Sequence, residues 1–131
     1  MLLENPMKSL TFLCFASLLL SGCYQQERKC LEFRTGTFQS QAYLNGKLIT
    51  STSVRNDSIE IDYFMGKSDT SSIRWINECE YIGTKLHPKS MADEKAIHIK
   101  ILTTDKDTYT FEYGLVGTTK NKKKGTAKKI K

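Results

Sequence analysis

The sequence has few of the residues that enzymes and metal proteins place in their sites. Its 131 residues include two histidines, four cysteines, two prolines and one tryptophan, and no cysteine or histidine pair has the close spacing of a zinc site. His87 precedes a proline, and His98 lies on the polar side of an alternating stretch, where a histidine usually faces solvent. No paired carboxylates, Ser/His/Asp set or Cys/His set stands out. We therefore expect a protein that is not an enzyme and that holds no metal or cofactor.

The chain also lacks an apolar run long enough to cross a membrane. Lys8 precedes about a dozen mostly apolar residues, whereas a helix that spans a bilayer needs ~20. A lysine before a short apolar run is typical of a secretory signal peptide, which we assign to residues 1–22. Met7 is a better start than Met1, because the residues between them add an acid and a proline.

The apolar run ends in Leu20-Ser21-Gly22-Cys23, which resembles the lipobox of bacterial lipoproteins. The resemblance implies that the signal peptide is cut before Cys23, that the thiol receives diacylglycerol, and that the freed amine is acylated, as with palmitate. An ordinary signal peptide with a cysteine at its cut site is the alternative. Because two or more acyl chains anchor a protein stably, the mature chain of about 109 residues would be held at a membrane without spanning it.

The residues after Cys23 bear on where such a lipoprotein is sorted. Tyr24 follows the cysteine, whereas in the sorting known from some Gram-negative bacteria an aspartate there favours the inner membrane. Residues 25–28 contain one acid, Glu27, and differ from the acidic signals that bring some lipoproteins to the cell surface. The resemblance thus implies the outer membrane, on its periplasmic face. Residues 23–31 are expected to form a lipidated linker.

Two of the four cysteines remain once the signal peptide and the lipid anchor are subtracted. Cys14 leaves with the signal peptide and Cys23 takes lipid, so Cys30 and Cys79 form a pair in an oxidising compartment. A disulfide between them would close a loop of about 49 residues and stabilise the fold by roughly 4 kcal/mol in the chain-entropy model. Two free buried thiols are the alternative. The sequence therefore predicts a Cys30–Cys79 disulfide.

From Phe33 onward the chain alternates between short strand patterns and turn signals, with almost no helical period. The dipeptide Asn45-Gly46, for instance, is typical of a two-residue hairpin turn. Strands are expected at residues 33–40, 47–55, 58–63, 72–77, 79–86, 96–103, 108–115 and 125–130. Short turns without long crossovers predict an antiparallel up-and-down meander. Closure of that meander is favoured because it removes exposed strand edges.

The expected fold is thus all-β, after a helical signal peptide. We predict a small lipocalin-like barrel or curled sheet of about eight strands, with a two-sheet sandwich as the alternative. Residues 32–118 are assigned to this barrel-like domain, and residues 119–131 to a Lys-rich tail with a possible last strand.

Aromatic residues recur on one face of several expected strands. We take six as candidates to line a cavity for an apolar or amphipathic ligand: Tyr63, Trp75, Tyr81, Tyr109, Phe111 and Tyr113. On the strand of Tyr63 the opposite face carries Glu60 and Asp62, which we interpret as a solvated stripe. Alternatively the rings fill the barrel, because about 100 residues leave little spare volume. The tyrosine hydroxyls keep the ligand interpretation open, since a dry core favours Phe and Leu.

The net charge of +6 is concentrated at the C-terminal end. Without this segment the chain would be close to neutral, because it holds Lys120, Lys122, Lys123, Lys124, Lys128, Lys129 and Lys131. The tail could bind anionic lipid headgroups or lipopolysaccharide phosphates near the anchor, and a disordered solubilising end is the alternative. No nucleic-acid partner is expected, because the lysines are not interleaved with aromatic residues.

Two resemblances cover the folded part of the chain. Residues 34–38 and 75–81 resemble lipocalin-like lipoproteins, in which a small-residue first strand and a central Trp hairpin close the barrel, although Phe38 stands where their Gly-x-Trp signature has Trp. Small flavobacterial lipoproteins are similar over residues 54–60, 72–77 and 109–114. Some of these carry a DNA topoisomerase IV label, which does not suit an exported lipoprotein that lacks a multidomain DNA gate.

These resemblances imply a non-catalytic, membrane-anchored lipoprotein. Its barrel would bind a small apolar or amphipathic ligand. The alternative is an envelope protein with a filled core, which acts through surface contacts with a protein or lipid partner. An interior cavity well above ~300 Å³ would favour the first function over the second.

Overall fold

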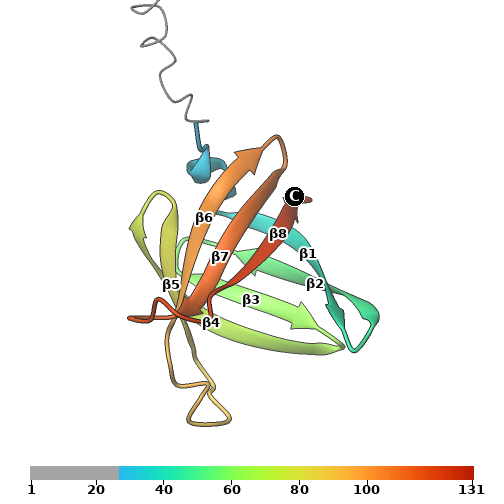
Figure 1. The fold of residues 1–131 in the computed structure, drawn as a ribbon, viewed down its shortest axis with the longest axis vertical. Helices are drawn as coiled ribbons and strands as arrows, with labels where there is room; N and C mark the ends of the chain where they lie inside the picture. Colours follow the sequence, from blue (N-terminus) through green and yellow to red (C-terminus); the bar gives the residue numbers. More distant parts are fainter. Residues whose placement is uncertain (1–26) are drawn as a thin grey trace, which may run out of the picture.

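The computed structural model describes residues 27–131 (Figure 1). The expected signal peptide, the lipobox and the lipidated Cys23 lie outside the described residues. The described elements are one 3-10 helix and eight strands: η2 (Cys30–Phe33), β1 (Gly36–Leu44), β2 (Lys47–Arg55), β3 (Ile59–Phe64), β4 (Lys67–Asn77), β5 (Glu80–Lys85), β6 (Ile97–Asp105), β7 (Thr108–Leu115) and β8 (Lys123–Lys129). Within these residues, no helix is long and apolar enough to span a bilayer.

All eight strands are antiparallel to their neighbours in the sequence, and β8 pairs with β1 to close the sheet. This confirms the predicted all-β, up-and-down meander and identifies it as a closed barrel rather than a curled sheet or a sandwich. Closure leaves no strand edge unpaired around the ring, which is the physical reason that short strands of this kind close.

Two of the hairpins at one end of the barrel turn on a pair of residues with positive φ. Asn45 and Gly46 have φ of 52° and 76°, as the sequence predicts, and Met65 and Gly66 have 49° and 73°. The sequence places the start of the next strand at residue 72, but β4 already begins at Lys67. A strand accommodates polar residues here because their side chains lie near the open mouth of the barrel and remain solvated.

The opposite end of the barrel is closed by η2 and by a cluster of buried side chains. A disulfide between Cys30 and Cys79 ties η2 to the turn between β4 and β5, which confirms the predicted pairing. The cluster consists of Cys30, Phe33, Phe38, Ile101, Tyr109 and Ala127, with Trp75, Cys79 and Phe111 packed against it. The apolar core therefore lies at one end of the barrel and does not fill the rest of the interior.

Strand β8 is formed by the Lys-rich segment and completes the barrel. It pairs with β7 over Lys123 to Lys128 and with β1 over Ala127 to Lys129. Gly125 and Ala127 face the interior, whereas Lys124 and Lys128 are exposed. The predicted last strand is thus present, and a disordered end is wrong for the residues of β8.

The assignment of the two faces of β3 is inverted relative to the expectation. Glu60 and Asp62 point into the barrel, whereas Tyr63 points outward and is 47% exposed. The expectation of a solvated stripe is therefore wrong. Alternation shows that a strand has two faces, but not which face turns inward, and here Arg55 of β2 forms an ion pair with the inward carboxylate of Glu60.

Candidate ligand-binding cavity

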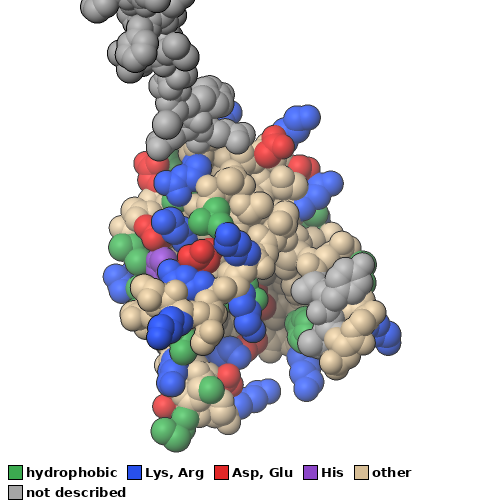
Figure 2. Space-filling model, viewed as in Figure 1, with side chains coloured by type: hydrophobic (Ala, Val, Ile, Leu, Met, Phe, Trp, Pro, Cys, Tyr) green, Lys and Arg blue, Asp and Glu red, His purple; other side chains and the backbone are tan. Residues whose placement is uncertain are grey.

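The open half of the barrel encloses a cavity of about 600 Å³. All eight strands contribute to its walls, and the loop between β5 and β6 adds Ala92, Asp93 and Lys95 at the mouth. The molecular surface is hollowed beside a group of lysine and arginine side chains (Figure 2). The volume lies within the range of about 300–1,000 Å³ that is usual for small-molecule sites.

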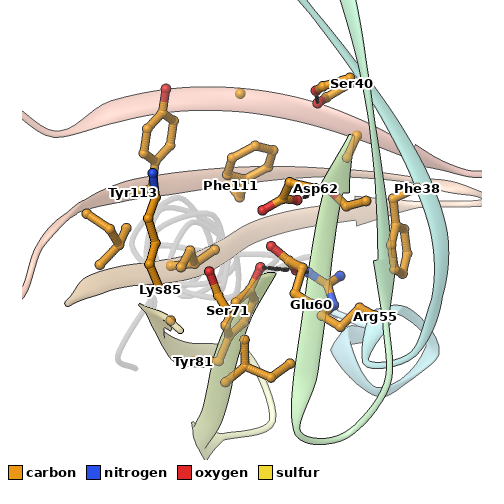
Figure 3. A pocket seen from close by; sticks show the side chains of 18 of the residues that line it. Phe38, Ser40, Arg55, Glu60, Asp62, Ser71, Tyr81, Lys85, Phe111 and Tyr113 are labelled. Atoms are coloured by element: carbon orange, nitrogen blue, oxygen red, sulfur yellow. Dashed lines mark hydrogen bonds and ion pairs between the residues drawn. The ribbon is translucent and has the colours of Figure 1, made fainter. Parts of the chain in front are cut away.

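The cavity has one polar and one apolar wall. Strands β1 to β4 supply serine hydroxyls at Ser40, Ser51, Ser53 and Ser71 together with the carboxyl groups of Glu60 and Asp62. Strands β4, β6 and β7 supply the apolar side chains of Ile73, Ile97, Ile99 and Phe111. In the close view Phe111 and Tyr113 lie opposite Ser71 and Glu60 (Figure 3). A ligand that fits both walls must itself be amphipathic.

The floor of the cavity is built around the guanidinium of Arg55, whose side chain is 1% exposed. It donates hydrogen bonds to Glu60 Oε2 at 2.9 Å and to the hydroxyl of Tyr81 at 2.6 Å. Its other donors reach the hydroxyl of Tyr109 at 3.2 Å and the carbonyls of Phe33 and Arg34 at 2.9 and 3.2 Å. This network joins β2 to β3, β5 and β7 and to the end of η2, so it fixes how the strands are arranged around the floor.

Aromatic rings surround the same guanidinium. Its central carbon lies 4.4 Å from the ring centroid of Phe38 and 5.0 Å from that of Tyr81. Burial raises the pKa of the Tyr81 hydroxyl well above its usual value and also raises the pKa of Tyr109. Both hydroxyls therefore stay protonated, and Tyr81 donates its own hydrogen to Glu60 at 3.1 Å. The buried cation is thus satisfied by hydrogen bonds and ring faces.

Asp62 lies next to this network on the polar wall. It makes no hydrogen bond to Arg55 and interacts with the network through the neighbouring carboxyl of Glu60. Its Oδ1 accepts a hydrogen bond from the hydroxyl of Ser53. Burial raises the pKa of Asp62 to about 6, and the nearby charge of Glu60 adds to the rise. At neutral pH the Asp62 carboxyl is therefore mostly ionised, although burial makes this charge unfavourable.

A lysine holds the loop between β5 and β6 against the mouth. Lys85 Nζ lies 2.8 Å from Asp69 Oδ2 on β4 and 3.4 Å from Asp93 Oδ1 in the loop. The backbone N–H of Lys89 donates to Asp93 Oδ2 at 3.2 Å, which lowers the pKa of that carboxyl. These contacts hold a segment without regular strand at the rim of the cavity, which it lines with Ala92, Asp93 and Lys95.

The structure separates the six aromatic candidates into three groups. Tyr81, Tyr109, Phe111 and Tyr113 line the cavity. Trp75 packs at the closed end, with its ring centroid 4.7 Å from that of Tyr81 and 5.1 Å from the guanidinium carbon of Arg34. Tyr63 is on the outer face of β3, away from the lining residues. Outside the barrel, His98 Nε2 lies 3.1 Å from Glu80 Oε1.

Sequence reasoning misses the charged and hydroxyl-bearing half of the cavity. Arg55, Glu60, Asp62 and Lys85 all point inward, and each lies in a strand whose alternation is compatible with either face. One signal could have found them: Glu60 and Asp62 share a face, and Arg55 shares the register of Glu60 across the hairpin. An arginine opposite a carboxylate in two adjacent strands is consistent with a buried pair.

The described residues hold no group of three or more His, Cys, Asp or Glu side chains placed to bind a metal ion. Comparisons with protein-family models, with curated proteins and with solved structures each find no match for this chain. The class of protein is therefore described by its fold and cavity alone, as an eight-stranded up-and-down barrel with an amphipathic interior cavity.

Proposed function

We propose that this chain is a membrane-anchored lipoprotein of the bacterial envelope whose barrel binds a small amphipathic ligand and catalyses no reaction. The cavity of about 600 Å³ carries the proposal, because an envelope protein that acts through its surface would fill its core. The polar and apolar walls favour an amphipathic ligand over a purely apolar one. The lipid anchor at Cys23 is supported by the sequence.

The position of the linker favours an arrangement in which the mouth is turned away from the membrane. Arg28 Nη1 donates to the carbonyl of Ile101 at 3.0 Å, and the N–H of Lys29 donates to Thr104 Oγ1 at 2.8 Å. Both contacts are at the closed end, so an anchor at Cys23 would hold that end toward the bilayer. Lys128, Lys129 and Lys131 are at the same end and would face anionic headgroups. The ligand would then enter from the periplasm at the outer membrane.

The test compares the full chain with two variants expressed in a Gram-negative host. We expect the full chain in the outer-membrane fraction, and Cys23→Ser in the soluble fraction, because the variant has no thiol to acylate. After mild detergent extraction, mass spectrometry should find a small amphiphile with the wild-type protein. In Ser71→Phe, a ring placed on the cavity wall should displace that amphiphile.

A fluorescence measurement tests ligand binding without relying on an amphiphile from the expression host. We expect the neutral probe N-phenyl-1-naphthylamine to bind the wild-type protein, and Ser71→Phe to weaken that binding at least 10-fold. A wild-type protein that neither carries an amphiphile nor binds the probe would overturn the ligand-binding function. Membrane retention of Cys23→Ser would overturn the lipid anchor alone.

A further inference from the structure

Arg55, the most buried cation of the cavity, has no N–H donor left to bind a ligand. A guanidinium has five N–H donors, and those of Arg55 make the five hydrogen bonds to Glu60, Tyr81, Tyr109 and two backbone carbonyls described above. A carboxylate or phosphate on a ligand could bind Arg55 only by displacing one of these partners. The floor therefore offers nothing to an anionic headgroup.

The carboxylates of the interior differ in whether they have a cation. Glu60 is paired with Arg55 at 2.9 Å, and Asp69 is paired with Lys85 at 2.8 Å. Asp62 is opposite Asp69 in the pairing of β3 with β4. Among the described residues its partners are the hydroxyl of Ser53 and the carboxyl of Glu60, and it makes no ion pair. Figure 3 shows Asp62 directed into the cavity beside Phe111. Asp62 is thus a carboxylate of the cavity without an ion pair among the described residues, and it is left to pair with a cation on a ligand.

Exposed lysines at the mouth favour an anionic ligand, but less strongly than Asp62 favours a cationic one. Lys95 and Lys124 line the entrance and are solvent-exposed. Exposed charges interact weakly with a ligand because water and salt screen them, over about 8 Å at physiological ionic strength. Asp62 is largely enclosed, so its interaction with a charge beside it is stronger. The lysines would mainly affect how ligands approach.

We propose, on the basis of the ligand-binding function above, that the cavity selects a small amphiphile with a protonated amine, which the carboxylate of Asp62 holds while the apolar part packs against Ile99 and Phe111. The amine would make a charge-assisted hydrogen bond with the carboxylate oxygen. It would also give Asp62 the ion pair that it lacks among the described residues. A neutral or anionic headgroup would leave Asp62 ionised without a cation.

Three probes with the same ten-carbon chain test this selectivity on the full chain. Decylamine, decanol and decanoate are compared by displacement of N-phenyl-1-naphthylamine at pH 7.5 and 0.15 M salt, below the concentration at which they form micelles. We expect decylamine to bind at least 10-fold more tightly than decanol, and decanoate more weakly than decanol. Asp62→Asn should weaken decylamine at least 10-fold and leave decanol within 3-fold. The matched control is Asp105→Asn, which removes an exposed acid at the closed end and should change neither.

The pH dependence gives a second measurement that needs no variant. The pKa of Asp62 is about 6 in the empty cavity, so the affinity for decylamine should be nearly full above pH 7 and fall by up to about 10-fold by pH 5, as Asp62 takes up a proton. The ionisable groups around Asp62 are Arg55 on β2, Glu60 on β3, Asp69 on β4, Lys85 and Tyr81 on β5, Asp93 and Lys95 in the loop between β5 and β6, Tyr109 and Tyr113 on β7, and Lys124 on β8. None is a histidine, so no imidazole titrates beside it in this range.

The outcomes separate the two proposals. Decanoate as the tightest probe would overturn the amine selectivity and assign the headgroup to the lysines at the mouth. Decylamine binding that Asp62→Asn and acid both leave unchanged would also overturn the role of Asp62. The ligand-binding function would survive that result. If neither the probes nor N-phenyl-1-naphthylamine bind the wild-type protein, both proposals are wrong.

Discussion

Arg55 is an uncommon residue to find at the bottom of a barrel, because a charged side chain that is 1% exposed loses its hydration. The structure compensates this loss with five hydrogen bonds and with the ring faces of Phe38 and Tyr81. A buried ion pair of this kind rarely adds net stability relative to apolar residues. Its effect here is geometric, since the end of η2 and the strands β3, β5 and β7 must all meet one planar group.

Asp62 differs from Arg55 because its charge is buried without such compensation. The pKa of its carboxyl rises from 3.8 in a model peptide to about 6 in the fold, mainly through burial. The folded state therefore binds this proton more tightly than the unfolded chain. It follows that the free energy of unfolding falls as the pH rises from about 4 to 6, and that ionised Asp62 destabilises the barrel above pH 6.

We predict that Asp62→Asn stabilises the ligand-free barrel at pH 7.5 by about 1–3 kcal/mol. Asparagine keeps the size of the side chain, and its amide oxygen can still accept the hydrogen bond of Ser53. The gain should shrink through pH 6 and vanish below pH 4, because the wild-type carboxyl is then neutral too. Urea unfolding followed by the emission of Trp75, the single tryptophan, measures it. A pH-independent gain, or an equal gain in Asp105→Asn, would contradict the explanation.

At the scale of single elements, each strand has an inward and an outward face, and both carry polar residues. In β6 the apolar residues Ile97, Ile99 and Ile101 turn inward, whereas in β3 the inward residues are Glu60 and Asp62. Hydrophobic alternation thus identifies the face correctly in β6 and incorrectly in β3. The difference arises because β6 contributes to the apolar wall and β3 to the polar wall, and this division depends on the closed barrel rather than on either strand.

Gly125 in β8 shows how closely one element depends on another. A Cβ at this position would lie 2.6 Å from the Cζ atom of the Phe111 ring on the neighbouring strand. The ring packs against the core cluster, so it cannot move without cost. Gly83 in β5 also lines the cavity, but a Cβ there would meet Ile73 and Ile99 at 3.9 and 4.0 Å, which is ordinary contact.

We therefore predict that Gly125→Ala destabilises the barrel by about 1–3 kcal/mol, through displacement of the Phe111 ring. The same substitution at Gly83 should change the free energy of unfolding by less than about 0.5 kcal/mol. Because the displaced ring would enter the cavity, Gly125→Ala should also weaken binding of N-phenyl-1-naphthylamine. Urea unfolding and probe titration give both quantities for each variant. Equal stability of the two variants would show that Phe111 relaxes freely.

For the whole molecule, the sequence predicts the architecture well and the interior poorly. Turn dipeptides such as Asn45-Gly46, the spacing of the strands and the pairing of Cys30 with Cys79 are local or compositional signals, and the structure confirms them. The cavity depends on how much volume remains once η2 and the core cluster occupy one end. That volume is a property of closure and of side chains from eight strands, which alternation along one strand does not contain.

In the Lys-rich segment, the high density of charge makes the sequence resemble a solvated tail although the segment forms a strand of the barrel. Residues 123–129 form β8, whose pairing with β1 is extended beyond the strand by the N–H of Thr37 donating to the carbonyl of Lys131 at 3.0 Å. The lysines of β8 are mostly exposed, which is why a solvated tail is a natural interpretation of the sequence. Two inward small residues, Gly125 and Ala127, are the sign of a strand in a crowded barrel wall.

We predict that deletion of residues 119–131 abolishes cooperative unfolding, whereas loss of charge in the same segment does not. The deletion exposes the edges of β1 and β7, and the chain should then associate through them. The control is the triple variant Lys120→Gln, Lys123→Gln and Lys124→Gln, which removes three exposed charges that make no ion pair within the described residues. It should keep the wild-type slope of the urea transition, because that slope follows the surface exposed on unfolding. A truncated chain that stays monomeric and unfolds with the wild-type slope would show that the barrel does not need β8.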